Sequence, residues 1–195
     1  MIPYSKHFID KEDIDAVVDV LRNKSITQGE LVGKFEKKIS NYVKSKYAVA
    51  VTSCSAGLHL SSTVVGMKNK NVVTSPITFA STASSILHSG GKLNFADISD
   101  KNINIDLENI NNLDFNVDTI IPIHFSGSAV ELKNFRNKNP KVKIIEDSAH
   151  ALGAKYKNGD MVGSCKFSDI SVFSLHPAKT ITAGEGGIIT TNNKD

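Results

Sequence analysis

Seven short apolar runs, separated by amphipathic stretches, constrain the fold of this chain more than any other feature. Alternation of this kind is typical of β–α units that build a largely parallel sheet. Most of the runs lack the polar alternation of a half-exposed strand, so helices should cover both faces. The sequence therefore predicts an α/β fold, a three-layer sandwich around a mostly parallel seven-stranded sheet. The predicted strands are residues 47–52, 71–75, 92–97, 118–124, 142–147, 169–175 and 187–191.

Two helices should precede the first strand. Asp10 is the expected N-cap of the first helix, with Asp13 in its first turn. The apolar residues behind them recur at helical spacing: Ile14, Val17, Val18 and Leu21. The second helix should span residues 29–44. Its buried stripe is predicted to hold Leu31, Phe35, Ile39 and Tyr42 or Val43.

Further helices should follow Ser55, Thr78 and Ser128. The last of these begins with a capping-box pattern, in which Ser128 and Glu131 would each satisfy the free backbone N–H of the other. Residues 108–116, rich in asparagine, are predicted to form a loose surface connection. Neither an internal repeat nor a domain linker is visible, so a single domain is expected.

Composition narrows the class of protein. With 195 residues, 40% hydrophobic and 22% charged, the chain can bury a full core without covalent staples. Its two cysteines are too few for a disulfide framework, which favours a reducing cytoplasm. A net charge of +3, spread along the chain, does not favour a nucleic-acid or anionic-membrane partner. Neither a signal peptide nor a run of roughly 18 apolar residues is present, so a soluble cytoplasmic protein is expected.

The predicted strand at residues 142–147 delivers Glu146 and Asp147, followed by Ser148, to its carboxyl end. Ligands of open α/β sheets bind at this edge, so these side chains are candidates for a site. An acidic residue after a strand is weak evidence by itself. Capping of a short helix through Ala151 by Asp147 is an equally simple interpretation.

A second candidate is Lys179, between a strand that ends near Ser174 and a glycine-rich return. A single lysine is normally solvated, but this one lies in a mostly uncharged stretch, residues 171–184, that we expect to be partly buried. Burial favours the neutral amine, which is the form that adds to a carbonyl group. His176, in the same stretch, is interpreted as a loop residue.

A third candidate is the turn of small residues at 52–57, which joins a strand to a helix. Small residues let backbone N–H groups approach an anion, and the helix N-terminus adds a favourable dipole. Taken alone, the turn is explained more simply by strand-to-helix packing. The histidines outside these segments show no metal-ligand spacing, so no metal site is predicted.

A lysine, a carboxylate and an anion cradle together suit one cofactor, a phosphorylated pyridine that carries an aldehyde. Three segments resemble, in order and spacing, the signatures of the fold-type-I, pyridoxal-phosphate-dependent nucleotide-sugar aminotransferases of the DegT/DnrJ/StrS group. The segments are TSPITFASTA, EDSAHALGA and FSLHPAKTITAGEGG. This resemblance extends over essentially the whole chain. It implies the large domain of the aspartate-aminotransferase-like fold, with pyridoxal 5'-phosphate as cofactor.

The resemblance implies roles for individual residues. Lys179 matches the lysine that binds the cofactor covalently and later moves protons. Asp147 matches the carboxylate that keeps the pyridine nitrogen protonated. His150 stands where the family has Gln or His near the phenolic oxygen, although a purely structural histidine remains an alternative. Phe79 matches the aromatic residue that stacks on the ring, with ordinary core packing as its alternative.

The phosphate-binding group of the family is matched by Ser174 together with Cys54 and Ser55. The commoner family turn reads Gly-Thr where this chain has Cys54-Ser55. This departure keeps a small residue and a hydroxyl, so the assignment of a phosphate cradle is only slightly weakened.

The implied reaction is amino transfer from an amino acid, by family habit glutamate, to a keto-sugar attached to a nucleotide. Within the family, His150, residues 27–29 and the run around Lys179 look most like the transaminases of the pseudaminic acid pathway. Those enzymes aminate the 4-keto group of a UDP-linked 6-deoxy-N-acetylhexosamine. A homodimer is implied as well, because active sites of this fold are built across a subunit interface.

The resemblance also implies that residues 1–195 form the cofactor-binding large domain with an N-terminal helical segment, without the small C-terminal domain of longer family members. Neither Arg22 nor Arg136 lies in a motif, so no residue is a good candidate for bidentate carboxylate recognition. The alternative is a truncated or split-gene half, a non-catalytic cofactor-binding or regulatory module with a separately encoded C-terminal half as partner. Lys179 argues against a dehydratase of the same family, and a plain Rossmann module would need a G-x-G-x-x-G turn.

Overall fold

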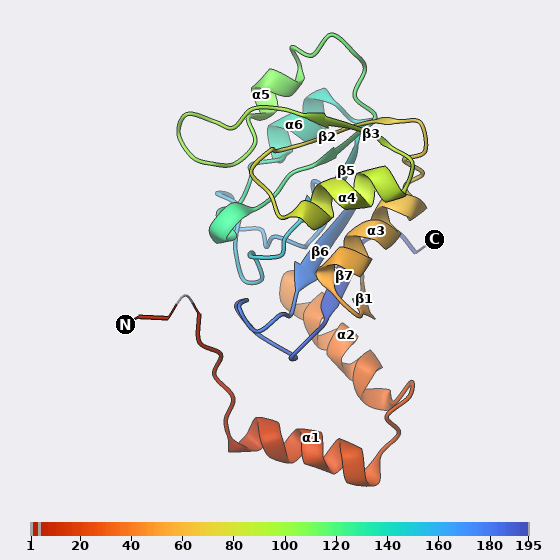
Figure 1. Ribbon diagram of the computed structural model, residues 1–195, viewed down its shortest axis with the longest axis vertical. Helices are drawn as coiled ribbons and strands as arrows, with labels where there is room; N and C mark the ends of the chain where they lie inside the picture. The colour runs from red at the N-terminus through yellow and green to blue at the C-terminus, as the bar shows by residue number, and fades with distance from the viewer. Residues whose placement is uncertain (1, 4, 195) are drawn as a thin grey trace.

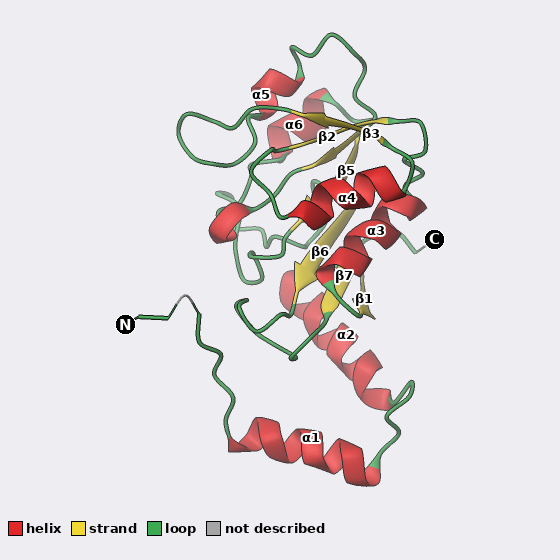
Figure 2. Ribbon diagram, in the orientation of Figure 1, coloured by secondary structure: helices red, strands yellow, loops and turns green. Residues whose placement is uncertain are grey.

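All seven predicted strands form one sheet in the computed structural model, which describes residues 2–3 and 5–194 (Figures 1 and 2). They are β1 (Tyr47–Val51), β2 (Asn71–Thr74), β3 (Lys92–Phe95), β4 (Thr119–Ile121), β5 (Lys143–Asp147), β6 (Ile170–Ser174) and β7 (Gly187–Thr191). Their order across the sheet is β1-β7-β6-β5-β4-β2-β3. Neighbours from β6 to β3 run parallel, whereas β7 runs antiparallel to both β6 and β1. The prediction of a mostly parallel sheet is confirmed.

Helices cover both faces of this sheet. They are α1 (Lys11–Asn23), α2 (Glu30–Val43), α3 (Cys54–Val64), α4 (Ala80–His88), α5 (Leu107–Ile110) and α6 (Lys133–Lys138), with a short 3-10 turn, η1 (Phe125–Gly127). Because successive strand residues point to opposite faces, Val72 packs with α3 and α4 while Val73 packs with α5 and α6. Ile39 and Val43 of α2 pack beside Phe173 on the second face. The three-layer sandwich is therefore confirmed.

The predicted first helix is present, but its apolar stripe is exposed. Asp10 accepts hydrogen bonds from the amides of Glu12 and Asp13, and the Asp13 side chain accepts one from the Asp10 amide, which completes a capping box. None of the residues of α1 is buried, and Leu21 is 61% exposed. Figure 1 shows α1 apart from the sandwich. In the described part of the chain, no helix combines the length and the apolar character needed to cross a bilayer.

The predicted stripe of α2 is confirmed only in its second half. Ile39 and Val43 are buried, and Phe35 packs partly against the same core. Tyr42 is mostly exposed, so Val43 occupies the buried position of the two alternatives, and Leu31 is exposed as well. The helix therefore contacts the sheet from Phe35 onward, and Glu36 also accepts a hydrogen bond from the Ala50 amide of β1 at 2.8 Å.

The predicted capping box at residues 128–131 is wrong. The helix α6 begins later, at Lys133, and the Glu131 carboxylate instead accepts a hydrogen bond from the Lys157 amide at 2.8 Å. Val130 and Leu132 are buried in the core, and the Val130 amide donates to the side chain of His124. These long-range contacts hold the segment out of a helix.

Residues 108–116 are also better ordered than predicted. The short helix α5, capped by Asp106, covers the first part of this segment. Ile110 is buried against α6 and the sheet, and Leu113 and Phe115 pack partly on the same cluster. The prediction of a loose connection is wrong, because it gave more weight to the asparagines than to the three apolar residues Ile110, Leu113 and Phe115.

Arg136 ties α6 to the amino-terminal end of two central strands. Its guanidinium donates to Asp169 Oδ2 at 2.7 Å and to the Val142 carbonyl oxygen at 2.9 Å. The same Asp169 oxygen accepts a bond from the Ile144 amide at 2.9 Å. Burial by itself would raise the pKa of Asp169, but the bonds from Ile144 and Arg136 outweigh it and hold that pKa below its ordinary value.

Replacing Arg136 by Met should lower the free energy of unfolding by about 2–3 kcal/mol, because the change leaves partly buried acceptors unsatisfied. Because the pKa of Asp169 in the folded protein lies below its value of 3.8 in the unfolded chain, this stabilisation is fully present at neutral pH. It is lost as the pH falls below 3.8 and through the lower folded-state pKa. Denaturant unfolding at several pH values measures both effects. Arg22→Met, at an exposed position of α1, is the matched control and should change stability by less than about 0.5 kcal/mol. Equal losses in the two variants would contradict the assignment.

Candidate active site

The strand register brings distant segments to one edge of the sheet. Val51, Gly187 and Ser174 lie side by side at the ends of β1, β7 and β6. Asp147, the last residue of β5, is paired with Val172 of β6. The turn into α3 follows β1 directly. The carboxylate, the small-residue turn and the strand that leads to Lys179 are therefore neighbours in space, as the three separate motifs require.

Asp147 is buried and its carboxylate is held on both oxygens. The hydroxyl of Thr82 donates to Oδ2 at 2.6 Å, and the amide of Ala149 donates to Oδ1 at 3.1 Å. The second bond forms a local turn, and no helix follows through Ala151. The alternative that Asp147 caps a helix is therefore wrong, because the segment after it forms a turn instead of a helix. The other carboxylate oxygen of Asp147 is bound by Thr82 of α4.

The N-terminus of α3 and the start of β7 approach each other unusually closely. A Cβ atom at Gly187 would lie 2.5 Å from the Ser53 carbonyl carbon and 2.6 Å from the Cys54 nitrogen, so only glycine fits there. Ser53 caps α3 by accepting from the Ala56 amide at 3.1 Å. In the part of the chain that the structure describes, the amides of Cys54 and Ser55 donate to no acceptor. Free amides at a helix N-terminus can bind an anion, so this pair is a candidate anion nest.

The side chains of the predicted cradle contribute unequally. Ser174 is buried at the end of β6, and its hydroxyl accepts a long bond from the His176 amide at 3.3 Å. Ser55 is exposed at the start of α3. The Cys54 thiol points inward toward the Val172 carbonyl oxygen, and burial raises its pKa. Cys54 can therefore bind an anion through its amide but not through its sulfur.

Lys179 lies in a closed loop between β6 and β7. The Leu175 amide donates to the Gly186 carbonyl oxygen at 2.9 Å, and the Leu175 carbonyl oxygen accepts from the Ala183 amide at 3.0 Å. These two bonds hold the ends of the loop together. The side chain of Lys179 is half-buried. The expected burial of residues 171–184 is confirmed for the strand and wrong for the second half of the loop, where Thr180 and Gly184 are exposed.

His150 lies in the electrostatic field of two other predicted residues, Lys179 and Asp147. Burial lowers the pKa of His150, the Lys179 ammonium lowers it further, and the Asp147 carboxylate opposes both. The Ser126 amide donates to Nδ1 of His150 at 3.3 Å. In the neutral imidazole the proton is then on Nε2, which is free to donate a hydrogen bond.

Phe79 precedes α4 as its N-cap residue and is 76% exposed. The alternative that this ring packs in the core is therefore wrong for the described chain. Its ring is available to cover a ligand at the same end of the helix that carries Thr82 toward Asp147. Sequence reasoning missed Thr82, although its spacing of three from Phe79 on a predicted helix was a usable signal.

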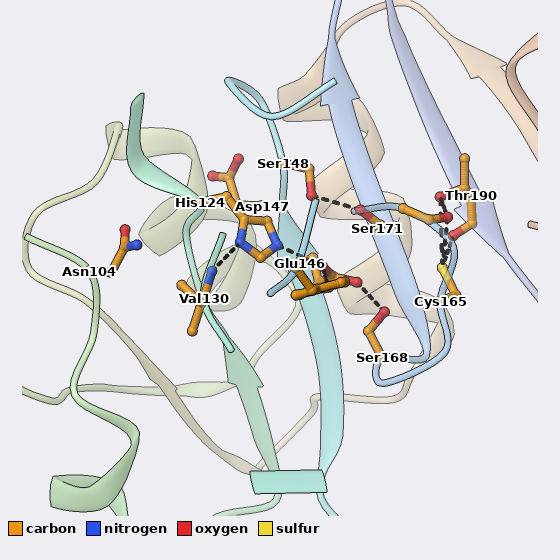
Figure 3. Close-up of polar contacts among 12 residues, drawn as sticks. Asn104, His124, Val130, Glu146, Asp147, Ser148, Cys165, Ser168, Ser171 and Thr190 are labelled. Carbon is orange, nitrogen blue, oxygen red and sulfur yellow. Dashed lines mark hydrogen bonds and ion pairs between the residues drawn. The ribbon is translucent and has the colours of Figure 1, made fainter. Parts of the chain in front are cut away.

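Glu146 does not belong to this edge, contrary to the prediction. It points to the opposite face from Asp147 and is fully buried, and Figure 3 shows His124 and Ser168 binding its carboxylate. The hydroxyl of Tyr156 donates to the same carboxylate. The Val130 amide donates to His124 Nδ1 at 2.9 Å, so Nε2 carries the proton toward Glu146 at 2.6 Å. Burial and the neighbouring carboxylate raise the pKa of Tyr156. Among the described residues, no group of His, Cys, Asp or Glu is arranged to hold a metal.

A comparison with protein families identifies the chain. The model of the DegT/DnrJ/EryC1/StrS aminotransferase family matches residues 7–195. The chain belongs to this family. Its sheet and helices are those of fold-type-I sugar aminotransferases, as predicted. Matches to individual family members extend over all or nearly all of the chain.

Two curated family members illustrate the sequence similarity. A UDP-4-amino-4,6-dideoxy-N-acetyl-beta-L-altrosamine transaminase of Campylobacter jejuni is 39% identical over 100% of this chain and 52% of its own length. The spore coat polysaccharide biosynthesis protein SpsC of Bacillus subtilis is 35% identical over 100% of the chain and 50% of its own length. The chain thus spans about half the length of the curated relatives it matches.

Solved structures of family members agree with the fold. Helicobacter pylori PseC, an aminotransferase involved in the biosynthesis of pseudoaminic acid, superposes with a TM-score of 0.89 at 34% identity and covers 98% of this chain and 52% of its own. The putative sugar aminotransferase Spr1654 of Streptococcus pneumoniae, in its PLP form, gives a TM-score of 0.89 at 27% identity, with coverages of 99% and 53%.

Replacing Tyr156 by Phe should destabilise the fold by about 1.5–3 kcal/mol, because the buried carboxylate of Glu146 loses a hydrogen-bond donor that water cannot replace. Tyr47→Phe, at an exposed position in β1, is the matched control and should have an effect below about 0.5 kcal/mol. Thermal and denaturant unfolding measure both. A Tyr156→Phe protein as stable as the control would show that Glu146 does not depend on this donor.

Proposed function

We propose that this chain is the cofactor-binding part of a pyridoxal-phosphate-dependent aminotransferase that acts on a nucleotide sugar. The observation that carries the proposal is the convergence at one sheet edge of a buried carboxylate, an anion nest and a lysine. Cys54, Asp147 and Lys179 are more than 30 positions apart in the sequence, but the register of β1, β7, β6 and β5 brings the segments that carry them to one edge of the sheet.

The residues present fit the cofactor. A phosphate needs several donors in a close backbone cradle, and the free amides of Cys54 and Ser55 beside Gly187, with the Ser174 hydroxyl, supply them. A protonated ring nitrogen needs a carboxylate, and the buried Asp147 is one. An aldehyde needs an amine, which Lys179 provides.

Each side chain has a distinct part in the proposed mechanism. When bound, pyridoxal phosphate supplies the electron sink that stabilises a carbanion. The Asp147 carboxylate would hold a proton on the ring nitrogen. His150 would donate from Nε2 to the phenolic oxygen, and the exposed ring of Phe79 would cover the cofactor. The Lys179 amine would hold the aldehyde carbon of the cofactor and would move protons as base and as acid.

For the substrate we propose glutamate as amino donor and a UDP-linked 4-keto-6-deoxy sugar as acceptor, in the synthesis of a surface polysaccharide or nonulosonic acid. The names of the Campylobacter relative and of the Helicobacter structure support this choice. The product then carries a 4-amino group. We further propose a cytoplasmic location, because free thiols at Cys54 and Cys165 suit a reducing compartment. A homodimer is proposed from the family resemblance, since active sites of this fold are built across a subunit interface.

The donor carboxylate and the sugar are proposed to contact groups outside residues 1–195 or in a second copy of the chain. Arg136 is engaged with Asp169 at the other end of the sheet, and Arg22 lies in the last turn of α1. We therefore propose that residues 1–195 form the large, cofactor-binding domain together with an N-terminal helical segment. The remaining half of the relatives' length would supply the substrate-binding groups.

Covalent trapping tests the lysine assignment. Pyridoxal phosphate is added to the purified protein, the adduct is reduced with borohydride, and the labelled peptide is located by mass. We expect the label at Lys179. Lys179→Arg keeps the charge and should lose both the label and the visible absorbance of the bound cofactor, whereas the exposed Lys166→Arg should keep both. A folded protein without specific label would favour a non-catalytic module.

Asp147→Asn should reduce the rate of amino transfer from glutamate by at least about a hundredfold, because a neutral amide cannot hold the ring nitrogen protonated. Cofactor labelling at Lys179 should persist. Asp118→Asn is the matched control, since Asp118 also accepts a backbone bond, from Asn71, but at the amino-terminal end of the strands. Unchanged turnover in Asp147→Asn would contradict the assigned role.

A further inference from the structure

A chain of hydroxyl groups ends on the carboxylate of Asp147. Thr78 Oγ1 donates to Thr82 Oγ1 at 2.8 Å, and Thr82 Oγ1 donates to Asp147 Oδ2 at 2.6 Å. Thr82 is fully buried, while Thr78 is half-buried at the turn into α4. The chain therefore runs from the rim of the candidate site to its deepest acidic group.

The direction of these bonds follows from the carboxylate, which when ionised can only accept, so the single proton of Thr82 goes to Asp147. The Thr82 oxygen then accepts from Thr78, whose proton has the more distant Phe79 carbonyl oxygen, at 3.3 Å, as its other acceptor. Asp147 Oδ1 accepts from the Ala149 amide. Both carboxylate oxygens thus accept, which is the arrangement of an ionised carboxylate, and each keeps a lone pair for one more donor.

The two donors come from different parts of the fold. The Ala149 amide belongs to the turn directly after β5, whereas Thr82 belongs to α4, on the face of the sheet that Asp147 faces. With one oxygen tied to each, the carboxylate cannot rotate about its terminal bond without breaking a charge-assisted bond. The same first turn of α4 follows the exposed ring of Phe79.

We infer that Thr82 is a positioning residue, which acts through Asp147 by fixing the orientation of its carboxylate toward the ring nitrogen of the cofactor. The inference rests on the proposed function. A purely structural threonine would instead stabilise the fold alone, and its replacement would affect cofactor affinity equally whether or not residue 147 is an aspartate.

The experiment is a double-mutant cycle on pyridoxal phosphate binding. Thr82→Val keeps the shape and removes the hydroxyl, so it should raise the dissociation constant about tenfold in the protein with Asp147. In the Asp147→Asn background the same change should have an effect below about twofold, because the interaction through the carboxylate is already altered. Thr82→Ser, which restores the hydroxyl, should return the dissociation constant to within about twofold of the original.

A second readout is the pH dependence of the bound cofactor's visible absorbance. It should shift in Thr82→Val and in Asp147→Asn but not in the matched control Thr190→Val. Thr190 is also fully buried and donates to a carbonyl oxygen, that of Gly163, but lies on β7. If Thr82→Val does not fold, Thr78→Val carries the test, since it removes the donor to Thr82 at a half-buried position and should weaken binding only when Asp147 is present.

The outcomes separate the two proposals. A folded protein that does not bind pyridoxal phosphate overturns the proposed function. Binding that is weakened by Asp147→Asn but not by Thr82→Val overturns only the role of Thr82. Equal effects of Thr82→Val in both backgrounds, or a Thr82→Ser protein as weak as Thr82→Val, also overturn it.

Discussion

Two adjacent buried carboxylates at the end of β5 each need hydrogen-bond donors, and much of the surrounding structure supplies them. Glu146 and Asp147 point to opposite faces of β5, and both are buried under helices and loops. A buried carboxylate is stable only with donors on its own side of the sheet. Glu146 obtains His124, Tyr156 and Ser168, and Asp147 obtains Thr82 and a backbone amide.

The two sets of donors have different consequences. Around Glu146 the network has side-chain donors to both oxygens and all its members are buried, so it fixes the β4–β5–β6 core. Around Asp147 each oxygen has one donor, which leaves acceptor capacity toward the sheet edge. The same strand therefore supplies a structural anchor on one face and, on the other, a carboxylate that can accept further hydrogen bonds.

The antiparallel strand β7 completes the site. Its insertion between β1 and β6 places Gly187 against the turn that enters α3, and it closes the loop that carries Lys179. A side chain at position 187 would push the helix N-terminus away from Ser174. The anion nest and the lysine loop thus depend on one close backbone contact.

The errors of sequence interpretation have a common physical origin. The capping-box pattern at Ser128 and Glu131 is locally favourable for a helix, but burial of Val130 and Leu132 outweighs it. In residues 108–116, three apolar side chains among asparagines suffice to bury α5. Local preferences amount to about 1 kcal/mol each, which is less than the burial of one or two large side chains.

The sequence by itself determined the strands, the layers, the family and the candidate residues, because apolar periodicity and motif order are properties of the chain alone. It could not determine that Glu146 and Asp147 have separate environments, that Cys54 offers its amide and not its thiol, or that Thr82 binds Asp147. Those features depend on which faces and segments meet across the sheet. Only the tertiary structure decides such contacts, since they join different segments of the chain: Tyr156 and Glu146 are 10 positions apart, and Thr82 and Asp147 are 65 apart.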